Sequence, residues 1–339
     1  MQVRLSRPKL RVYSCNPTIG ATPSNMTLQT EPPSGPIIIR WKDLEPSWHL
    51  PKQEPGFMRW MVQWVGGPEG YYNSNPGHAV ISHDIAVGFQ GMPPKNCQRG
   101  LHYHTITETY VVLRGQLLGW DGYGKEHLAG PLDCIYIPAG VPHGVRSYGD
   151  EPAELLWLHD ALEKRGSSTY WFAGDYNPQD DSKEDIKVVR YNDILPNWEA
   201  AQALPPGHMH ANLNYQGGVK GSQNFSPQHA VPNDKAALGL TIIPEGHKQL
   251  ITGRPNAELC IIVRGKAVVT VDNRNEELNL KDAIYVPAGC SRTLRNHGQE
   301  PTYIVWVHAR PSSHEPPPSP ANGTLSNSAV TDGDVPHGG

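Results

Sequence analysis

The sequence predicts an all-β protein of two consecutive barrels, with short helices only in the connections. Its 339 residues include 34 glycines and 33 prolines, which interrupt helices. Between these residues lie short β-branched or aromatic runs at 79–89, 109–113, 134–137 and 153–159, and such runs are typical of strands. Short strands separated by regular turns favour a sandwich or a closed barrel, because closure hides the strand edges.

A repeat in the sequence predicts that there are two such barrels. Val111–Gly115 returns 150 residues later as Ile261–Gly265, and Ile135–Gly140 returns 149 residues later as Ile284–Gly289. Other segments recur in the same order at the same interval. An ordered series of matches at a nearly constant interval indicates a duplicated domain.

The repeat and the composition of the two ends predict the domain organisation. The segment after residue 310 is rich in proline and small polar residues, which cannot bury enough apolar surface to offset the entropy of ordering. We expect an N-terminal arm over 1–36, a first domain over 37–165, a linker over 166–186, a second domain over 187–310 and a disordered C-terminal tail over 311–339.

Charge and composition exclude several classes of partner and compartment. The 29 Lys and Arg residues against 33 Asp and Glu residues give a net charge of -4, which argues against nucleic-acid and anionic-membrane partners. The five cysteines form no Cys-x-x-Cys pair, so neither a disulfide framework nor a zinc ribbon is indicated. No apolar run is long enough to span a bilayer, and the first residues lack a secretory signal. We therefore expect a cytoplasmic protein without membrane contacts.

The first copy contains residue types that bind metals, at a spacing that brings them together. His102, His104 and Glu108 have the same parity, so in one regular strand they would project from one face, unless a bend redirects Glu108. His143 follows a proline-containing turn that would bring it in from another strand. Three imidazoles and one carboxylate suit a first-row ion such as Fe(II), Mn(II), Ni(II), Cu(II) or Zn(II). Four protein ligands on a six-coordinate ion leave two positions for substrate chemistry.

The second copy keeps only the carboxylate of this set. The positions that correspond to the four candidate ligands are Thr252, Arg254, Glu258 and Arg292. Guanidinium groups stay protonated and cannot bind a metal ion. We therefore expect no metal in the second barrel, and we expect one of the two arginines to form an ion pair with Glu258.

The metal-binding pattern of the first copy resembles the paired motifs of a known superfamily. Residues 100–108 read Gly-x-His-x-His-x-x-x-Glu, Gly115 follows, and residues 138–143 read Pro-x-Gly-x-x-His, as in the cupins. With its duplication, the chain resembles a bicupin over residues 37–160 and 187–309. The resemblance implies two jelly-roll β-barrels, and a metal held by the residues that match the motifs, which are His102, His104, Glu108 and His143.

The resemblance also implies an activity. At the level of the superfamily, the chain is similar to ring-cleaving bicupins such as quercetin and gentisate dioxygenases. This similarity implies a non-heme Fe(II) dioxygenase that acts with O2 on an aromatic, enolic or polyketide-like small molecule, with Mn, Ni, Cu and Zn as the alternative metals. It also implies a homodimer. Glu108 is the candidate catalytic residue, because its carboxylate would compensate the charge of the ion or transfer a proton.

Two other functions stay open, because cupins also include decarboxylases, isomerases, lyases and storage proteins. In the first, the metal acts as a Lewis acid in a non-redox isomerase, decarboxylase or lyase. Oxalate decarboxylases keep their ligands in both barrels, so the loss of one set weighs against that branch, though not against isomerases. In the second, the protein is a non-catalytic bicupin that binds or stores a small molecule. The intact ligand set of the first copy argues against that function.

Further side chains are candidates for the surroundings of the metal. Tyr110 has the parity of the ligands and is a candidate for substrate contact, with a ring that fills the core as the alternative. His159 is a second candidate for the substrate pocket, although the metal-free copy keeps His308 at the same place, which favours packing. The aromatic stretch that contains Trp60, Trp64, Tyr71 and Tyr72 is expected to form an apolar plate between the barrels.

Overall fold

The computed structural model confirms the all-β class. It describes residues 31–44, 46–49, 59–67, 79–98, 100–162, 169–170, 184–194, 196–198, 207–271 and 273–310. Within that part of the chain the regular structure consists of strands and of the short 3-10 helices η1 (Trp41–Asp43) and η3 (Tyr191–Asp193). None of the helices among the described residues has the length and apolar character needed to span a bilayer. The predicted tail, most of the predicted arm and most of the predicted linker lie outside the described residues.

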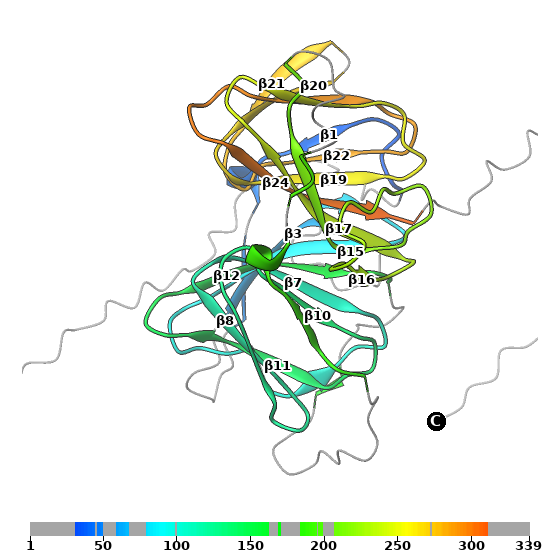
Figure 1. Ribbon diagram of the computed structural model, residues 1–339. Helices are drawn as coiled ribbons and strands as arrows, with labels where there is room; N and C mark the ends of the chain where they lie inside the picture. Colours follow the sequence, from blue (N-terminus) through cyan, green and yellow to red (C-terminus); the bar gives the residue numbers. More distant parts are fainter. Residues whose placement is uncertain are drawn as a thin grey trace, which may run out of the picture.

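The first lobe is a barrel of two sheets (Figure 1). One sheet has the strand order β14-β10-β7-β12-β5-β3-β2, with β4 paired to β3, and the other has the order β13-β6-β11-β8-β9. The strands of this lobe are β2 (Ser47–His49), β3 (Arg59–Gly66), β4 (Val80–Ile81), β5 (Ala86–Met92), β6 (His102–Tyr103), β7 (Glu108–Arg114), β8 (Gln116–Asp121), β9 (Glu126–Ala129), β10 (Cys134–Ile137), β11 (His143–Tyr148), β12 (Ala153–His159), β13 (Thr169–Tyr170) and β14 (Lys187–Val189).

The second lobe repeats this architecture. Its larger sheet has the order β1-β22-β19-β24-β17-β15-β16 and its smaller sheet the order β18-β23-β20-β21. The strands are β1 (Ile37–Ile39), β15 (Ala211–Gly217), β16 (Val231–Pro232), β17 (Ala236–Ile243), β18 (Lys248–Ile251), β19 (Glu258–Arg264), β20 (Ala267–Val271), β21 (Arg274–Leu278), β22 (Ala283–Val286), β23 (Arg292–Asn296) and β24 (Thr302–Ala309). The tandem barrels predicted from the repeat are therefore present.

The two lobes exchange their first strands. Strand β1 pairs with β22 of the second lobe, with Ile38 opposite Ile284, and in Figure 1 the blue β1 lies among the strands of that lobe. Strand β14 pairs in the same way with β10 of the first lobe, with Val188 opposite Ile135. The domain boundaries at residues 37 and 187 stay predictions. Each of these residues begins a strand that joins the larger sheet of the other lobe.

The segments that follow the exchanged strands make equivalent contacts. The backbone N–H of Trp41 donates to Asp282 Oδ1 at 2.9 Å, and the N–H of Tyr191 donates to Asp133 Oδ1 at 3.0 Å. Each aspartate also accepts a hydrogen bond from the arginine that precedes the aromatic residue. The duplication therefore extends to the interface, where the two copies hold each other by the same interactions.

An apolar plate fills the space between the lobes. Trp64 of the first lobe and Tyr215 of the second belong to one buried cluster, and Trp60 packs against it. The indole Nε1–H of Trp64 also donates to the carbonyl of Lys281 across the interface, at 3.0 Å. The predicted plate is confirmed for Trp60 and Trp64, while residues 71–72 lie outside the described part of the chain.

In each lobe a glycine makes room for a tryptophan ring. A β-carbon added at Gly88 would overlap the ring of Trp157 and come within 2.6 Å of the carbonyl oxygen of Val62. A β-carbon added at Gly239 would overlap the ring of Trp306 in the same way. Each tryptophan ring therefore packs directly against the glycine backbone of the neighbouring strand and occupies the space that a β-carbon would need.

We predict that Gly88→Ala and Gly239→Ala each lower the free energy of unfolding by about 1–3 kcal/mol, because overpacking displaces a buried ring or a strand. Urea denaturation would measure the change. Gly35→Ala is the control, since a β-carbon there meets nothing within 4 Å, and it should change the free energy by less than about 0.5 kcal/mol. Equal stabilities for all three variants would contradict the close contacts.

Candidate metal centre

Four side chains meet inside the first barrel. His102 lies on β6, Glu108 begins β7, His143 begins β11, and His104 lies in the connection between β6 and β7. Each of them offers one ligand atom, and these atoms all lie within 4.8 Å of one another. The four residues are between 0% and 5% exposed. The side chains that the sequence singled out as metal ligands are therefore together and shielded from solvent.

Strand pairing, rather than alternation along one strand, brings these residues together. In one regular strand, alternation would place the ligands on the same face. The segment is not one strand, because β6 ends at Tyr103 and β7 begins only at Glu108. His102 is instead placed by its pairing with His143 on β11. The carbonyl of His104 accepts a hydrogen bond of 2.7 Å from the N–H of Gly140, which ties the connection to the turn before β11. The bend left open by the sequence is thus present, and the register of neighbouring strands compensates for it.

Backbone carbonyls orient two of the histidines. His143 Nδ1 is 2.8 Å from the carbonyl of Val141, and His102 Nδ1 is 3.4 Å from the carbonyl of Gly100. Because a carbonyl can only accept a hydrogen bond, Nδ1 carries a proton in both rings, and Nε2 is the nitrogen that faces the other polar side chains of the site. This is the arrangement that histidine ligands of metals commonly show.

The carboxylate of Glu108 is the centre of the cluster. Its Oε2 is 2.8 Å from His104 Nε2 and 3.0 Å from His143 Nε2, while its Oε1 is 3.3 Å from His159 Nε2. Burial by itself would raise the pKa of Glu108, but the charge of His104 and the hydrogen bonds of the three histidines hold the pKa well below its ordinary value. The carboxylate is therefore charged at neutral pH.

The histidines on which burial acts most strongly are neutral. Burial lowers the pKa of His102 well below its ordinary value, and the neighbouring His143 and His104 lower it further. Burial also lowers the pKa of His159, although its hydrogen bond with Glu108 acts in the opposite direction. A neutral imidazole is the form that binds a metal ion, so His102 can bind one at neutral pH without first losing a proton.

The donor set fits a first-row metal ion. Ligand atoms held about 2.1 Å from one ion lie about 3 to 4 Å apart, depending on the angle between them. The four donor atoms lie within 4.8 Å of one another, so small side-chain rotations bring them to those distances. Three imidazole nitrogens and one carboxylate oxygen are ligands of iron, manganese, nickel, copper and zinc. His102, His104, Glu108 and His143 are therefore able to hold such an ion.

Sequence reasoning did not identify Gln98 as part of this site. Gln98 is 4% exposed, and its Nε2 is 3.3 Å from His102 Nε2. Its Oε1 accepts a hydrogen bond of 3.4 Å from the hydroxyl of Tyr110, whose ring belongs to the core of the first lobe. Tyr110 therefore reaches the ligands through Gln98. No signal marks Gln98 in the sequence, because it precedes the motif and lies outside the named strands.

The equivalent place in the second barrel holds an ion pair. Arg292 donates from Nε to Glu258 Oε2 at 2.8 Å and from its Nη2 to Glu258 Oε1 at 2.9 Å. His308 Nε2 is 3.1 Å from the same Oε1, and Arg254 contacts His308 at 3.4 Å. Burial would raise the pKa of Glu258, but Arg292 and His308 hold the pKa well below its ordinary value. Thr252 is exposed, whereas Glu258 and Arg292 are buried.

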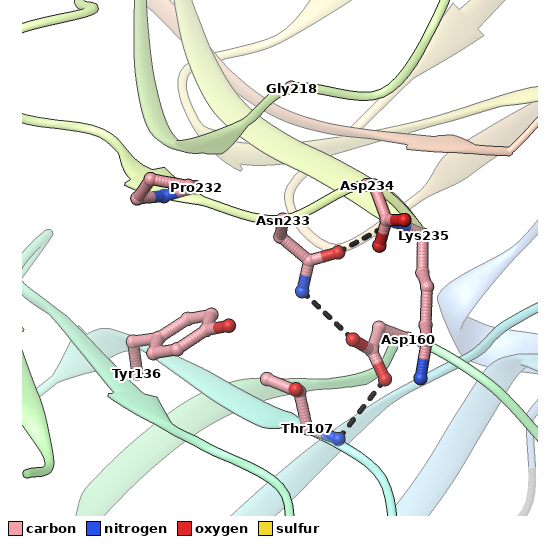
Figure 2. Close-up of a pocket in the computed structure, with 8 residues that line it drawn as sticks. All are labelled: Thr107, Tyr136, Asp160, Gly218, Pro232, Asn233, Asp234 and Lys235. Atoms are coloured by element: carbon pink, nitrogen blue, oxygen red, sulfur yellow. Dashed lines mark hydrogen bonds between the residues drawn. The ribbon is translucent and has the colours of Figure 1, made fainter. Parts of the chain in front are cut away.

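A pocket between the lobes is lined in part by residues that are sequence neighbours of Glu108 and His159. It has a volume of about 460 Å³ and is shown in Figure 2. Asp160 accepts hydrogen bonds from the N–H of Thr107 at 3.1 Å and from Asn233 Nδ2 of the second lobe at 2.8 Å. Thr107 and Asp160 directly adjoin Glu108 and His159. The lining residues are Thr107, Tyr136, Asp160, Gly218, Pro232, Asn233, Asp234 and Lys235.

Comparison with sequence families finds two cupin domains. The model of the cupin domain matches residues 88–159 and 239–308, which means one match in each barrel. An uncharacterised protein of Methanocaldococcus jannaschii is 32% identical over 82 residues, which are 24% of this chain and 66% of that protein. The match to this relative thus covers a minor part of the present chain.

Solved structures share the architecture at low sequence identity. Salicylate 1,2-dioxygenase from Pseudoaminobacter salicylatoxidans is 14% identical, with a TM-score of 0.50 over 74% of this chain and 76% of that chain. Oxalate decarboxylase from Lactobacillus farciminis, in complex with formate, is 16% identical, with a TM-score of 0.51 over 84% of this chain and 88% of that chain. Oxalate decarboxylase from Bacillus subtilis, a protein with Mn(II) centres, is 15% identical, with a TM-score of 0.51 over 84% of this chain and 79% of that chain.

These similarities establish the fold and leave the reaction open. Likeness at such identities extends to the arrangement of strands but not to the chemistry of the site. Each lobe carries one cupin match, and the paired lobes resemble bicupin structures over most of the chain. The chain therefore contains a match to the cupin domain in each barrel and has the bicupin fold of two tandem jelly-roll domains.

Proposed function

We propose that this bicupin is a metal-dependent enzyme with one metal centre, in the first barrel, and that it is an Fe(II) dioxygenase. Its substrate would be an aromatic, enolic or polyketide-like small molecule, and both atoms of O2 would enter the product. The observation that carries the proposal is the convergence of four buried donor atoms within 4.8 Å in one barrel. A homodimer and a cytoplasmic location remain predictions from the sequence.

The ligands would have two roles, which are to bind the ion and to offset its positive charge. His102 and His143 would bind through Nε2, because their Nδ1 protons are used by backbone carbonyls. Glu108 would supply the negative charge that offsets part of the charge of the ion, and its low pKa keeps that charge in place. An iron(II) ion held by His102, His104, Glu108 and His143 would supply electrons to O2, and these four ligands would leave two positions for a substrate oxygen and for O2.

The second barrel is proposed to bind no metal. Both carboxylate oxygens of Glu258 already accept hydrogen bonds from Arg292. A buried guanidinium keeps its charge and would repel an incoming cation. The proposal is therefore one ion per chain, with the second lobe in a structural role.

The surroundings of the site support an apolar substrate. The interior of the first lobe is a cluster of buried apolar side chains that includes Val112, Ile137, Val145 and Leu155. We infer that a substrate bound inside this barrel would meet apolar side chains, which suit aromatic or polyketide-like molecules better than highly charged ones and limit the access of water. The same four ligands would also serve a Lewis-acid isomerase, decarboxylase or lyase, and similar folds occur in oxalate decarboxylases. That reaction class is the alternative which the oxygen experiment below separates from the proposal.

The metal content of the purified protein tests the first step. Protein purified without added metal is expected to contain about one first-row ion per chain by elemental analysis. His102→Ala combined with Glu108→Ala should remove the ion and leave cooperative unfolding intact. Arg254→Ala, the equivalent of a change at His104 in the second barrel, is the control and should keep the ion. A well-folded, metal-free preparation of the unmodified protein would contradict both enzymatic functions and favour a binding or storage role.

Oxygen uptake tests the reaction class. With catechols, hydroquinones, flavonols and β-diketones as a panel, we expect O2 consumption with at least one compound, together with loss of turnover under anaerobic conditions. The double variant at His102 and Glu108 should lose turnover, because the four ligands act as one unit. Substrate conversion that is equally fast with and without O2 would rule out the dioxygenase and establish the Lewis-acid alternative.

A further inference from the structure

The two oxygens of the Glu108 carboxylate face different groups. Oε2 lies 2.8 Å from His104 Nε2 and 3.0 Å from His143 Nε2, on the side where the donor atoms of the cluster converge. Oε1 lies 3.3 Å from Nε2 of His159, whose ring centroid is 4.9 Å from that of His104. His159 is not one of the four clustered residues. The carboxylate thus has one oxygen directed to the metal-binding residues and one directed to a histidine outside the cluster.

The second barrel also places a histidine of its last strand against one oxygen of the buried carboxylate. Glu258 Oε1 is 3.1 Å from His308 Nε2. Here the guanidinium of Arg292, the equivalent of His143, binds both oxygens, with Nε 2.8 Å from Oε2 and Nη2 2.9 Å from Oε1. In both lobes Oε1 of the buried carboxylate therefore contacts the histidine of the last strand.

His159 is held firmly enough to orient a carboxylate. It pairs directly with Glu108 in the ladder between β12 and β7, and its ring centroid lies 4.9 Å from that of Trp157. Just beyond the end of this ladder, the N–H of Asp160 donates to the carbonyl of Thr107, and the Asp160 carboxylate accepts from the N–H of Thr107. The same carboxylate accepts a hydrogen bond from Asn233 of the second lobe (Figure 2). Backbone pairing, ring packing and the neighbouring lobe therefore determine where His159 Nε2 points.

We propose that His159 is a positioning residue of the metal centre, which holds Glu108 Oε1 and leaves Oε2 as the single donor to the ion. This inference rests on the proposed metal centre. A carboxylate can bind a metal through one oxygen or through both. If Oε1 were released, it would be free to turn toward the ion and occupy one of the two positions proposed for substrate and O2. His159 would therefore control how many positions stay open, without touching substrate or metal.

The test uses Co(II) alone as the probe, in the full-length metal-depleted protein. His159→Phe keeps a ring of similar size on Trp157 but has no N–H, and His159→Gln keeps an amide N–H donor. We expect His159→Phe to weaken Co(II) binding by about 10- to 100-fold, as the loss of such an outer hydrogen bond does, and to change the visible absorption spectrum of bound Co(II), which depends on coordination number. His159→Gln should restore the spectrum and bring the affinity to within about 3-fold of the unmodified protein.

His308→Phe is the matched control, since it removes the same hydrogen bond from the metal-free barrel. It should leave the affinity and the spectrum of Co(II) unchanged, whatever it does to thermal stability. An unchanged spectrum and affinity in His159→Phe would overturn the positioning role. Equal loss in His159→Gln and His159→Phe would also overturn it, because His159 would then be a ligand itself. Absence of Co(II) binding in the unmodified protein would instead reject the metal centre, on which the proposal depends.

Discussion

A buried carboxylate at the start of one strand in each lobe is the constraint around which both sites are arranged. Glu108 and Glu258 are 5% and 3% exposed, and each is charged. An isolated charge in such a place costs several kcal/mol, so cations or hydrogen-bond donors have to surround it. The second barrel meets this need with the guanidinium of Arg292, and the first barrel surrounds its carboxylate with histidines. The same buried charge therefore supports an ion pair in one copy and, in our proposal, a metal in the other.

Each copy provides structural support to the other. Each lobe completes the larger sheet of the other through β1 and β14, and Asp133 and Asp282 bind equivalent segments across the interface. Loss of the second copy would remove β14 from the larger sheet of the first lobe, together with the Asn233 hydrogen bond to Asp160. The second lobe therefore stabilises the strands that carry the candidate ligands, even though its own site is filled by Arg292.

The same four ligands suit several reactions, so in our proposal the neighbouring side chains decide which substrate reacts. A salicylate dioxygenase and oxalate decarboxylases share this architecture, and the fold alone does not distinguish between their chemistries. In this chain Gln98 and Tyr110 approach the ligands from the barrel interior, and His159 approaches from the side of Glu108. These neighbours would influence which substrate atoms reach the ion and how many positions remain for them.

The all-β class, the duplication, the candidate ligands and the absence of three of them from the second copy can all be predicted from the linear order of residues. These features depend on local composition, on spacing within one motif and on comparison of the two copies. Three-dimensional packing is needed to see the exchange of β1 and β14, the placement of His102 by pairing with His143, and the contacts of Gln98, Asp160 and Asn233. These contacts are made between strands, and a strand's pairing partner depends on packing of the whole chain rather than on its own residues.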